Sequence, residues 1–260
     1  MTRLLEVKGL GKNFGGLRAI NDLSFHLDDG EILGVIGPNG AGKTTAINLI
    51  SGVYRPDSGR VVFSSDDVTG LRPHFLAERG LVRTFQSTVV YRESTVLENV
   101  LRGAFMRLYP GFWHTLLSTS RARRMAGEVQ TAVTELLEWL DLGEYEYRRA
   151  DSLPYGHQKI LGVAVALATK PRLVMLDKPA AGLSSEEAEH VRDVIQRVNR
   201  GGVSIIVVDH NMRFMSGLCH RMVVMHYGSK LAEGEPEAVI SDPKVIEAYL
   251  GTGYDHADAE

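Results

Sequence analysis

A glycine-rich segment at residues 37–44 reads G-P-N-G-A-G-K-T and matches the phosphate-binding pattern G-x-x-x-x-G-K-[ST]. Glycines allow the backbone to turn so that successive N–H groups point toward phosphate oxygens. Lys43 would contact the β- and γ-phosphates of a nucleotide, and the Thr44 hydroxyl would bind Mg²⁺. The alternative is a chance match in a glycine-rich turn, but the segment lies between an expected strand and an expected helix, as the motif requires. The predicted nucleotide site consists of Gly37, Pro38, Asn39, Gly40, Ala41, Gly42, Lys43, Thr44 and Thr45.

Three polar residues elsewhere have the chemistry that such a site needs. Asp177 ends the apolar run L-V-M-L-D, and a carboxylate at the end of a buried strand can hold Mg²⁺ directly or through water. Alone this signal is weak, because such strand ends are common. Gln86 could equally be an ordinary polar loop residue. His210 follows another apolar run, where a lone histidine is more often structural, and we expect Asp209 before it to be a strand-end residue of lesser role.

Two further segments complete an ordered set of motifs. Residues 153–158 read L-P-Y-G-H-Q and open an expected helix, and residues 181–184 read A-G-L-S. In their order along the chain, these segments resemble the Walker A, Q-loop, signature, Walker B, D-loop and H-loop motifs of the ABC ATPase family. The resemblance covers essentially the whole chain, and the ordered set is far more specific than any single motif.

Within that family the chain most resembles the larger ATP-binding subunit of branched-chain amino acid importers. The similar segments are N-F-G-G-L-R-A-I at 13–20, the block 100–150, P-A-A-G-L at 179–183 and G-E-P-E-A-V-I-S-D-P-K-V-I-E-A-Y-L-G at 234–251. The last is the most telling, because many relatives in other transport systems lack it. The resemblance implies ATP and Mg²⁺ as cofactors. It also implies three kinds of partner: integral-membrane permease subunits, a second ATP-binding subunit that dimerises head to tail, and a solute-binding protein that acts indirectly.

The resemblance also implies roles for individual residues. Phe14 would stack on the adenine ring, although its position alone favours an ordinary core aromatic. Gln86 would touch Mg²⁺ or the attacking water and sense the membrane subunit, and His210 would contact the γ-phosphate and that water. Mg²⁺ would be held by Thr44, Gln86 and Asp177. Each ATP would lie between one Walker A loop and the partner's signature motif. The signature residues expected at the opposite nucleotide are Pro154, Tyr155, Gly156, His157 and Gln158.

The residue after Asp177 departs from the family pattern. Relatives have a glutamate there, the general base for the attacking water, whereas this chain has Lys178. A protonated amine cannot accept a proton, and losing a general base typically costs 10²- to 10⁴-fold in rate. Lys178 could instead pair with the γ-phosphate and favour a long-lived ATP state. We therefore assign Lys178 to the catalytic position, together with His210 and Gln86, and expect it to impair hydrolysis.

The signature motif is the second departure. The family form has serine, two small residues and glutamine, whereas this chain has Pro154 and, in place of the glutamine, His157. Proline removes a hydroxyl and an N–H group that could meet a phosphate. Proline or alanine at this position also occurs in the branched-chain importer group, so the effect is expected to be mild. His157 could still donate a hydrogen bond and could gain charge near pH 6.5.

Buried-type strands alternate with helical segments along much of the chain, which favours a parallel α/β sheet. Short antiparallel strands are expected at 4–8 and 22–27. Further strands are expected at 31–36, 60–63, 173–176, 203–208 and 222–225. Helices are expected at 44–51, 125–140 and 184–199. Thr95 with Glu98, and Ser184 with Glu187, have the spacing of capping boxes that begin helices.

The fold implied by the resemblance is an α/β P-loop NTPase of the RecA-like type. It has a parallel-sheet core, an antiparallel β subdomain and a helical insertion subdomain. We predict one ABC ATP-binding domain over residues 1–260. Its parts are a core with the β subdomain at 1–87 and 158–235, a helical subdomain with the signature at 88–157, and a C-terminal tail at 236–260.

Composition and charge exclude several classes. The chain has 29 basic and 32 acidic residues, so nothing supports a nucleic-acid partner, which normally shows as a basic excess. The single cysteine, Cys219, excludes an intrachain disulfide. The apolar run 203–208 is far shorter than the roughly twenty residues of a membrane span, and the N-terminus, broken by Glu6 and Lys8, does not read as a signal peptide. Together with this, the resemblance implies a cytoplasmic chain that lies peripherally on the inner face of the cell membrane.

Three functions remain open at this stage. The first is ATP hydrolysis that drives solute import through a permease. Residues 87–118 would dock this permease, and the alternative is that Phe112 and Trp113 simply pack inside the helical block. The second is an ATP-binding switch or degenerate half-site subunit with little hydrolysis, which Lys178 favours. The third is an ABC protein that acts on DNA or ribosomes. Such proteins usually carry tandem cassettes or long coiled coils, and this chain has neither.

Overall fold

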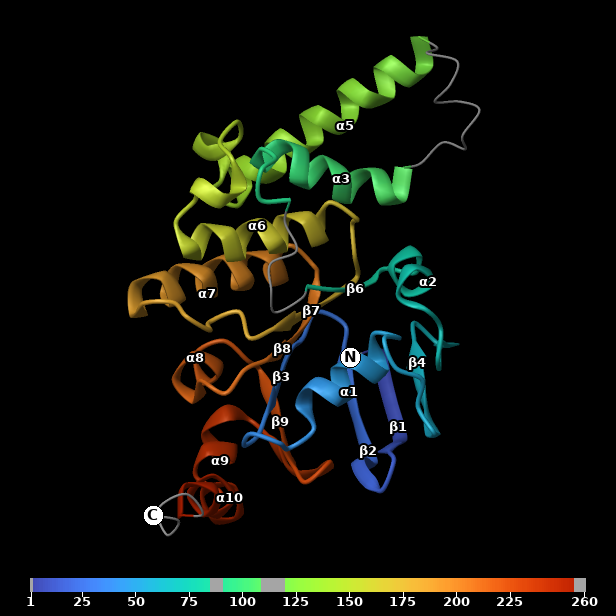
Figure 1. The fold of residues 1–260 in the computed structure, drawn as a ribbon, viewed down its shortest axis with the longest axis vertical. Coiled ribbons are helices and arrows are strands. Elements are labelled where there is room, and N and C mark those ends of the chain that lie inside the picture. Colours follow the sequence, from blue (N-terminus) through green and yellow to red (C-terminus); the bar gives the residue numbers. More distant parts are fainter. Residues whose placement is uncertain (1, 85–90, 109–119, 255–260) are drawn as a thin grey trace. The chain divides into compact units, whose positions relative to one another are not determined.

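The computed structural model describes residues 2–84, 91–108 and 120–254. Its contacts divide the chain into two compact units (Figure 1). The first contains Met1–Arg83, Arg172–Gly182 and Ile195–Glu260, and the second contains Thr84–Pro171 and Leu183–Val194. The second unit thus runs past residue 157, where the sequence placed the end of the helical subdomain. The functional boundaries stay a prediction.

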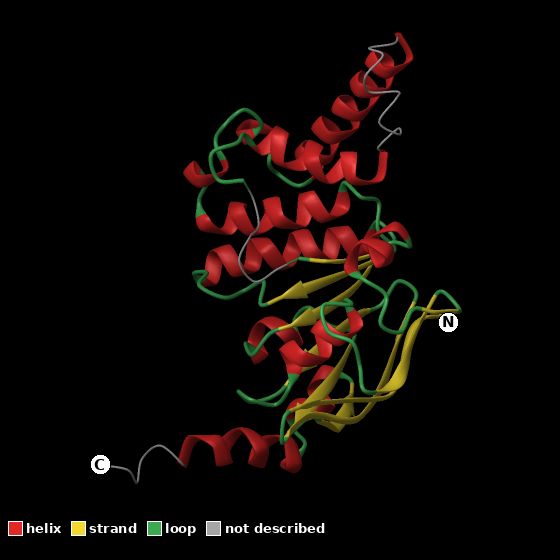
Figure 2. Ribbon diagram, turned by 45° about the vertical axis from the view of Figure 1, so that its right-hand side comes forward, coloured by secondary structure: helices red, strands yellow, loops and turns green. Residues whose placement is uncertain are grey.

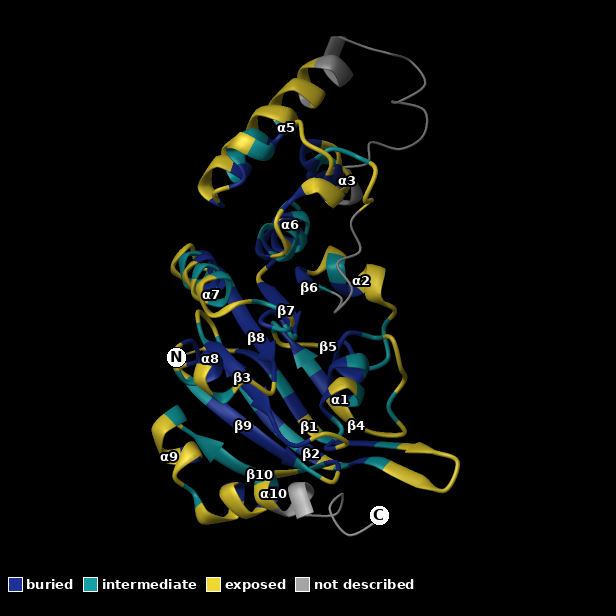
Figure 3. Cartoon of the chain, turned by 60° about the vertical axis from the view of Figure 1, so that its left-hand side comes forward, coloured by how far each residue is buried: buried dark blue, intermediate teal, exposed yellow. Residues whose placement is uncertain are grey.

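A parallel sheet forms the centre of the first unit. Within the described residues its strand order is β10-β9-β3-β8-β7-β6, and every pair is parallel except β10 with β9. The strands are β3 (Ile32–Ile36), β6 (Leu81–Arg83), β7 (Leu173–Asp177), β8 (Ser204–Val208), β9 (Arg221–His226) and β10 (Ser229–Gly234). β3, β7 and β8 are buried at every position, as Figure 3 shows, and their mainly apolar sequences are typical of central parallel strands.

A second, antiparallel sheet completes this unit and appears with the first among the yellow strands of Figure 2. Its order is β2-β1-β4-β5, formed by β1 (Arg3–Phe14), β2 (Leu17–Asp28), β4 (Ser58–Phe63) and β5 (Asp66–Asp67). The helices of the unit are α1 (Lys43–Ile50), α2 (Pro73–Glu78), α8 (Met212–Ser216), α9 (Pro236–Ile240) and α10 (Pro243–Tyr254). The predicted parallel core and antiparallel β subdomain are confirmed, and the predicted tail contains two helices.

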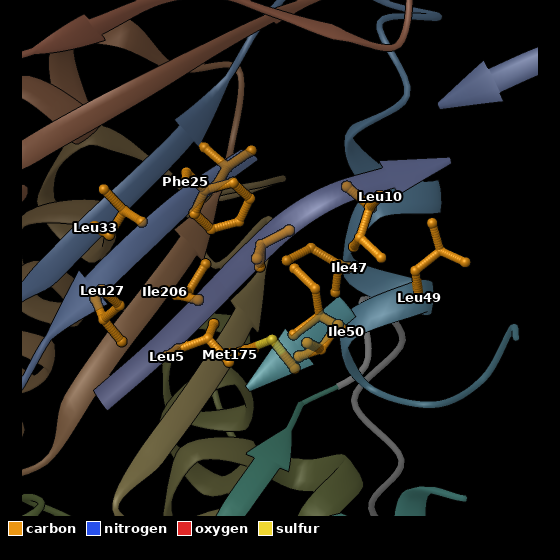
Figure 4. Close-up of a cluster of buried hydrophobic side chains, with 14 of the residues drawn as sticks. Leu5, Leu10, Phe25, Leu27, Leu33, Ile47, Leu49, Ile50, Met175 and Ile206 are labelled. Carbon is orange, nitrogen blue, oxygen red and sulfur yellow. The ribbon is translucent and has the colours of Figure 1, made fainter. Parts of the chain in front are cut away.

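One hydrophobic cluster joins both sheets to α1 (Figure 4). Leu5 and Phe25 come from the antiparallel sheet, Leu33 and Ile206 from the parallel sheet, and Ile47 from the helix. Burying side chains of this size stabilises a fold by about 1.5–3 kcal/mol each relative to exposure. The cluster therefore fixes α1, and the loop before it, against both sheets.

The second unit is helical. It contains α3 (Val96–Leu108), α5 (Ser120–Trp139), η1 (Gly143–Tyr145), η2 (Ala150–Ser152), α6 (Tyr155–Leu167) and the first part of α7 (Ser185–Arg200). Both predicted capping boxes are confirmed. Thr95 and Glu98 exchange backbone-to-side-chain hydrogen bonds of 2.9 and 3.2 Å before α3, and Ser184 and Glu187 do the same before α7. No helix in the described parts of the chain is both long and apolar enough to cross a membrane.

Close packing of α3 on α6 depends on Gly103. A Cβ atom at Gly103 would lie 2.4 Å from the backbone oxygen of Val165, so the helices would have to separate. We expect Gly103→Ala to lower the free energy of unfolding by about 1–3 kcal/mol, the usual cost of overpacking. The matched control is Gly127→Ala in α5, where nothing lies within 4 Å of the added atom. That change should be stabilising by up to about 1 kcal/mol. Urea unfolding of both variants measures the difference, and equal effects would contradict this packing.

Candidate nucleotide-binding site

The glycine-rich loop connects β3 to α1 in the first unit, as the motif requires. Gly37, Gly40 and Gly42 have φ angles of 149°, 79° and 95°, in the region that favours glycine. At Gly37 and Gly42 there is also no room for a side chain. An added Cβ would lie 2.2 Å from the Met225 carbonyl oxygen at Gly37, and 2.8 Å from the Ala19 carbonyl oxygen at Gly42. The backbone of the loop is therefore held by its neighbours in this glycine-dependent shape.

Lys43 lies at the start of α1 with its side chain turned into the loop. Its ammonium group donates hydrogen bonds of 2.6 and 2.8 Å to the carbonyl oxygens of Gly37 and Pro38. Burial and the charge of Lys178 lower the pKa of Lys43, and the carboxylates of Asp209 and Asp177 partly offset this. The structure therefore brings the predicted Lys43, Asp177 and Lys178 within electrostatic reach of one another.

Asp177 ends β7 as predicted, and its side chain is buried. Its Oδ2 atom accepts a hydrogen bond of 2.9 Å from Arg83, whereas Oδ1 is buried with no hydrogen-bond partner among the described residues. A buried carboxylate oxygen without a donor is costly unless a cation or water meets it. Carboxylate and hydroxyl ligands completed by nucleotide phosphates are typical of Mg²⁺ sites. Asp177 therefore suits the role of a metal ligand. Thr44 has an exposed side chain and could be the second ligand. Gln86, the third predicted ligand, lies outside the described residues.

Lys178 follows the end of β7 with a φ of 50°, in the left-handed region. Its backbone N–H donates a hydrogen bond of 2.6 Å to the carbonyl oxygen of Val208, which ties the ends of two neighbouring strands together. The side chain is half-buried. The backbone at this position is therefore fixed by the sheet.

Asp209 has a larger structural role than the sequence indicated. It is completely buried at the end of β8, and its carboxylate accepts three backbone hydrogen bonds. Oδ1 accepts from His210 and Asn211 at 2.7 and 3.1 Å, and Oδ2 accepts from Ala180 at 3.2 Å. Asp209 thus connects the backbone at His210 and Asn211 to the backbone at Ala180, two residues after Lys178. The imidazole of His210 is exposed, with Nδ1 3.4 Å from Asp209 Oδ1.

Removing the Asp209 carboxylate should destabilise the first unit strongly. We expect Asp209→Ala to lower the free energy of unfolding by about 3 kcal/mol or more, because each buried donor left without an acceptor costs about 1–3 kcal/mol. Asp209→Asn keeps one acceptor oxygen and should lose less. Urea unfolding of the three proteins tests this order. An alanine variant as stable as the parent would show that water replaces the carboxylate.

Phe14, the predicted adenine contact, lies at the end of β1 with 42% of its surface exposed. The alternative that it is a core aromatic is therefore wrong. Its ring forms a T-shaped pair with that of Tyr54, with centroids 5.3 Å apart and planes at 72°, and the Lys12 ammonium group lies 5.7 Å from the Phe14 centroid. Tyr54 was not predicted from the sequence. The pair leaves an exposed aromatic surface in the unit that contains the phosphate loop.

The signature motif lies in the second unit, at the start of α6. Pro154 caps this helix without a side-chain hydrogen bond, and Gln158 donates to the Leu153 carbonyl oxygen at 2.9 Å. The N–H of Gly156 donates to Glu187 Oε1 at 3.2 Å, and a Cβ at Gly156 would lie 3.3 Å from the Glu187 Cβ. Tyr155 is exposed. Glu187 therefore links the signature to the beginning of α7, a contact that the sequence did not indicate.

His157 lies between two aromatic rings. Its centroid is 4.9 Å from that of Tyr145 and 5.6 Å from that of His190. Burial, and secondarily the charge of His190, lower the pKa of His157, while nearby carboxylates partly offset this. The protonation that the sequence places near pH 6.5 is therefore shifted to lower pH, because burial disfavours the cation. As the neutral imidazole His157 can still donate one hydrogen bond.

Comparison with known proteins places these motifs in a family. The family model described as "ABC transporter" matches residues 20–181, and "Branched-chain amino acid ATP-binding cassette transporter" matches residues 229–255. The high-affinity branched-chain amino acid transport ATP-binding protein LivG of Escherichia coli is 39% identical over 95% of this chain and 98% of its own length. BraF of Pseudomonas aeruginosa, named for the same transport, is 36% identical with the same coverage.

A solved structure is similar over the same extent. The crystal structure of the ADP conformation of MJ1267, an ATP-binding cassette of an ABC transporter, is 31% identical. It superposes with a TM-score of 0.84 over 96% of this chain and 100% of that chain. The predicted P-loop NTPase fold is confirmed.

Proposed function

The chain belongs to the ABC transporter family, and we propose that it is the ATP-binding, energy-coupling subunit of an importer for branched-chain or other amino acids. The observation that carries the proposal is the loop 37–44, whose buried Lys43 lies within electrostatic reach of Asp177. The names of the relatives support amino acids as the solute. ATP binding and hydrolysis would drive the conformational change of the permease.

In this proposal ATP binds with Mg²⁺ at the first unit. Lys43 and the backbone N–H groups of the loop hold the phosphates, and Phe14 stacks on the adenine. Asp177, Thr44 and Gln86 hold Mg²⁺, which would neutralise charge on the β- and γ-phosphates. His210 orients the attacking water near the γ-phosphate. These roles are supported by residue type, by burial of Lys43 and Asp177, and by exposure of Phe14 and Thr44.

The partners follow from the same proposal. A second ATP-binding subunit pairs head to tail, so that the signature residues 154–158 face the partner's nucleotide. Integral-membrane permease subunits hold the chain on the inner face of the cell membrane, and a solute-binding protein acts through them. We propose that the segment 87–118 contacts a permease. Residues 87–90 and 109–118 of this segment, with Phe112 and Trp113, lie outside the described residues.

Lys178 supports a second candidate, an ATP-binding switch or degenerate half-site that hydrolyses little. Its charge adds to burial in lowering the pKa of Lys43, so both cations would face the terminal phosphates. In that case the nucleotide would close the dimer and turn over slowly. The two candidates share ATP binding and differ in hydrolysis.

Leucine uptake by the complete transporter tests the solute assignment. The chain, its permeases, the second ATP-binding subunit and the solute-binding protein would be placed in vesicles with ATP enclosed. We expect ATP-dependent uptake of leucine that is faster with Lys178→Glu than with the parent and absent with Lys43→Ala. Nucleotide binding without uptake of leucine, isoleucine or valine by either active form would show that the solute is another compound.

A further inference from the structure

Arg83 connects two elements of the nucleotide site. It is the last residue of β6, and its side chain is buried, with 8% exposed. One guanidinium nitrogen donates to Oδ2 of Asp177 at 2.9 Å. Another donates to Asn48 Oδ1 and, at 3.4 Å, to Ser51 Oγ. Asn48 lies in α1 and Ser51 caps its end, so one planar group joins β7 to the helix that begins with Lys43 and Thr44.

This contact sets the direction of the Asp177 carboxylate. The two oxygens turn together, so holding Oδ2 also fixes the position of Oδ1. Oδ1 is the atom that is buried without a hydrogen-bond partner in the described part of the chain. A guanidinium is suited to this task, because its donors are planar and fixed in direction, whereas an ammonium group is a flexible point charge.

We propose that Arg83 is a positioning residue for the Mg²⁺ site. It holds Asp177 so that Oδ1 faces the metal. It also fixes the end of β7 relative to α1, the helix that contains Thr44. This inference rests on the proposed function, in which Asp177 and Thr44 are metal ligands. Arg83 lies three residues before Gln86 in the chain and thereby joins the backbone leading to the Q-loop to the same carboxylate.

A purely structural ion pair is the competing explanation. Breaking a buried pair destabilises the fold because it leaves an uncompensated charge. In that case an Arg83 variant would lose stability, and its affinities for metal and for nucleotide alone would change together or not at all. A positioning residue instead affects the metal selectively.

The experiment uses Mn²⁺ as the probe and follows the spin-resonance signal of the free ion. Mn²⁺ is titrated into protein saturated with a non-hydrolysable ATP analogue, and affinity for the analogue is measured separately in EDTA. For Arg83→Met we expect the Mn²⁺ dissociation constant to rise at least about tenfold, the scale of one charge-assisted hydrogen bond. Affinity in EDTA should stay within about threefold, a change of less than 1 kcal/mol. Arg83→Lys, which keeps the charge, should recover part of the loss and also serves if the methionine variant does not fold. The exposed Arg79→Met is the matched control and should leave both constants unchanged.

Each other outcome overturns the inference. Unchanged or tighter Mn²⁺ binding by a folded Arg83 variant would show that the guanidinium does not position the metal ligand. An equal fall in both affinities would show a structural role alone. A parent that binds the analogue in EDTA but takes up no Mn²⁺ would refute the metal site itself. A parent that binds no nucleotide would overturn the proposed function, which is a separate result.

Discussion

Replacing Lys178 by glutamate should raise steady-state ATP hydrolysis by at least about tenfold, the lower part of the range for a general base. Attack on the γ-phosphate needs a group that accepts a proton from water, and a charged ammonium group cannot do so. The full range of 10²- to 10⁴-fold corresponds to about 3–5 kcal/mol of barrier. Because the backbone at Lys178 is held by Val208, the new carboxylate would replace the amine without moving the chain.

Charge acts in the same direction as the missing base. Burial and, second to it, the charge of Lys178 lower the pKa of Lys43, because two nearby cations disfavour each other. A second cation near the γ-phosphate stabilises the ATP-bound ground state and so does not by itself accelerate the reaction. Lys178→Gln separates the two effects, because it removes the cation without supplying a base.

Phosphate release would be measured with the permease and partner subunits present, since isolated subunits are not expected to dimerise stably. We expect Lys178→Gln to change the rate far less than Lys178→Glu. Equal rates for the parent and the glutamate variant would mean that another residue is the base, or that Pro154 and His157 limit turnover.

The elements that could be predicted are those with local signals. β7 and β8 are mainly apolar, with Asp177 at the end of β7 and Asp209 directly after β8, and both lie within a residue of the expected bounds. Capping-box spacing located the beginnings of α3 and α7. β6 and β10 were not predicted, for different reasons. β6 has only three residues, and β10 reads S-K-L-A-E-G, a half-buried strand whose pairing with β9 no local pattern indicates.

The site divides in the same way. The phosphate loop could be predicted because its chemistry requires a fixed spacing of glycines, lysine and threonine. The residues that hold the site together act across long separations and left no such pattern. Arg83 contacts Asp177 across 94 positions, and Asp209 contacts Ala180 across 29. The lowered pKa of His157 has the same origin, because its burial and its contact with His190 arise only in the folded chain.

Lys43→Ala should remove most of the affinity for ATP. The ammonium group is the charge expected at the β- and γ-phosphates, and truncating a buried charge partner costs about 2–5 kcal/mol. That range corresponds to at least about thirtyfold in the dissociation constant. The variant also loses the hydrogen bonds to Gly37 and Pro38, which stabilise the shape of the loop. The exposed Lys244→Ala, at the start of α10, is the matched control and should bind as the parent does.

Calorimetric titration of the parent, Lys43→Ala and Lys244→Ala with ATP and Mg²⁺ tests the central claim most directly. The claim is that the loop 37–44 is a nucleotide site despite the lysine at position 178. We predict saturable binding to the parent and to Lys244→Ala, with affinity for Lys43→Ala at least about thirtyfold weaker. A parent that binds no ATP, or a Lys43→Ala variant that binds as tightly as the parent, would contradict the assignment.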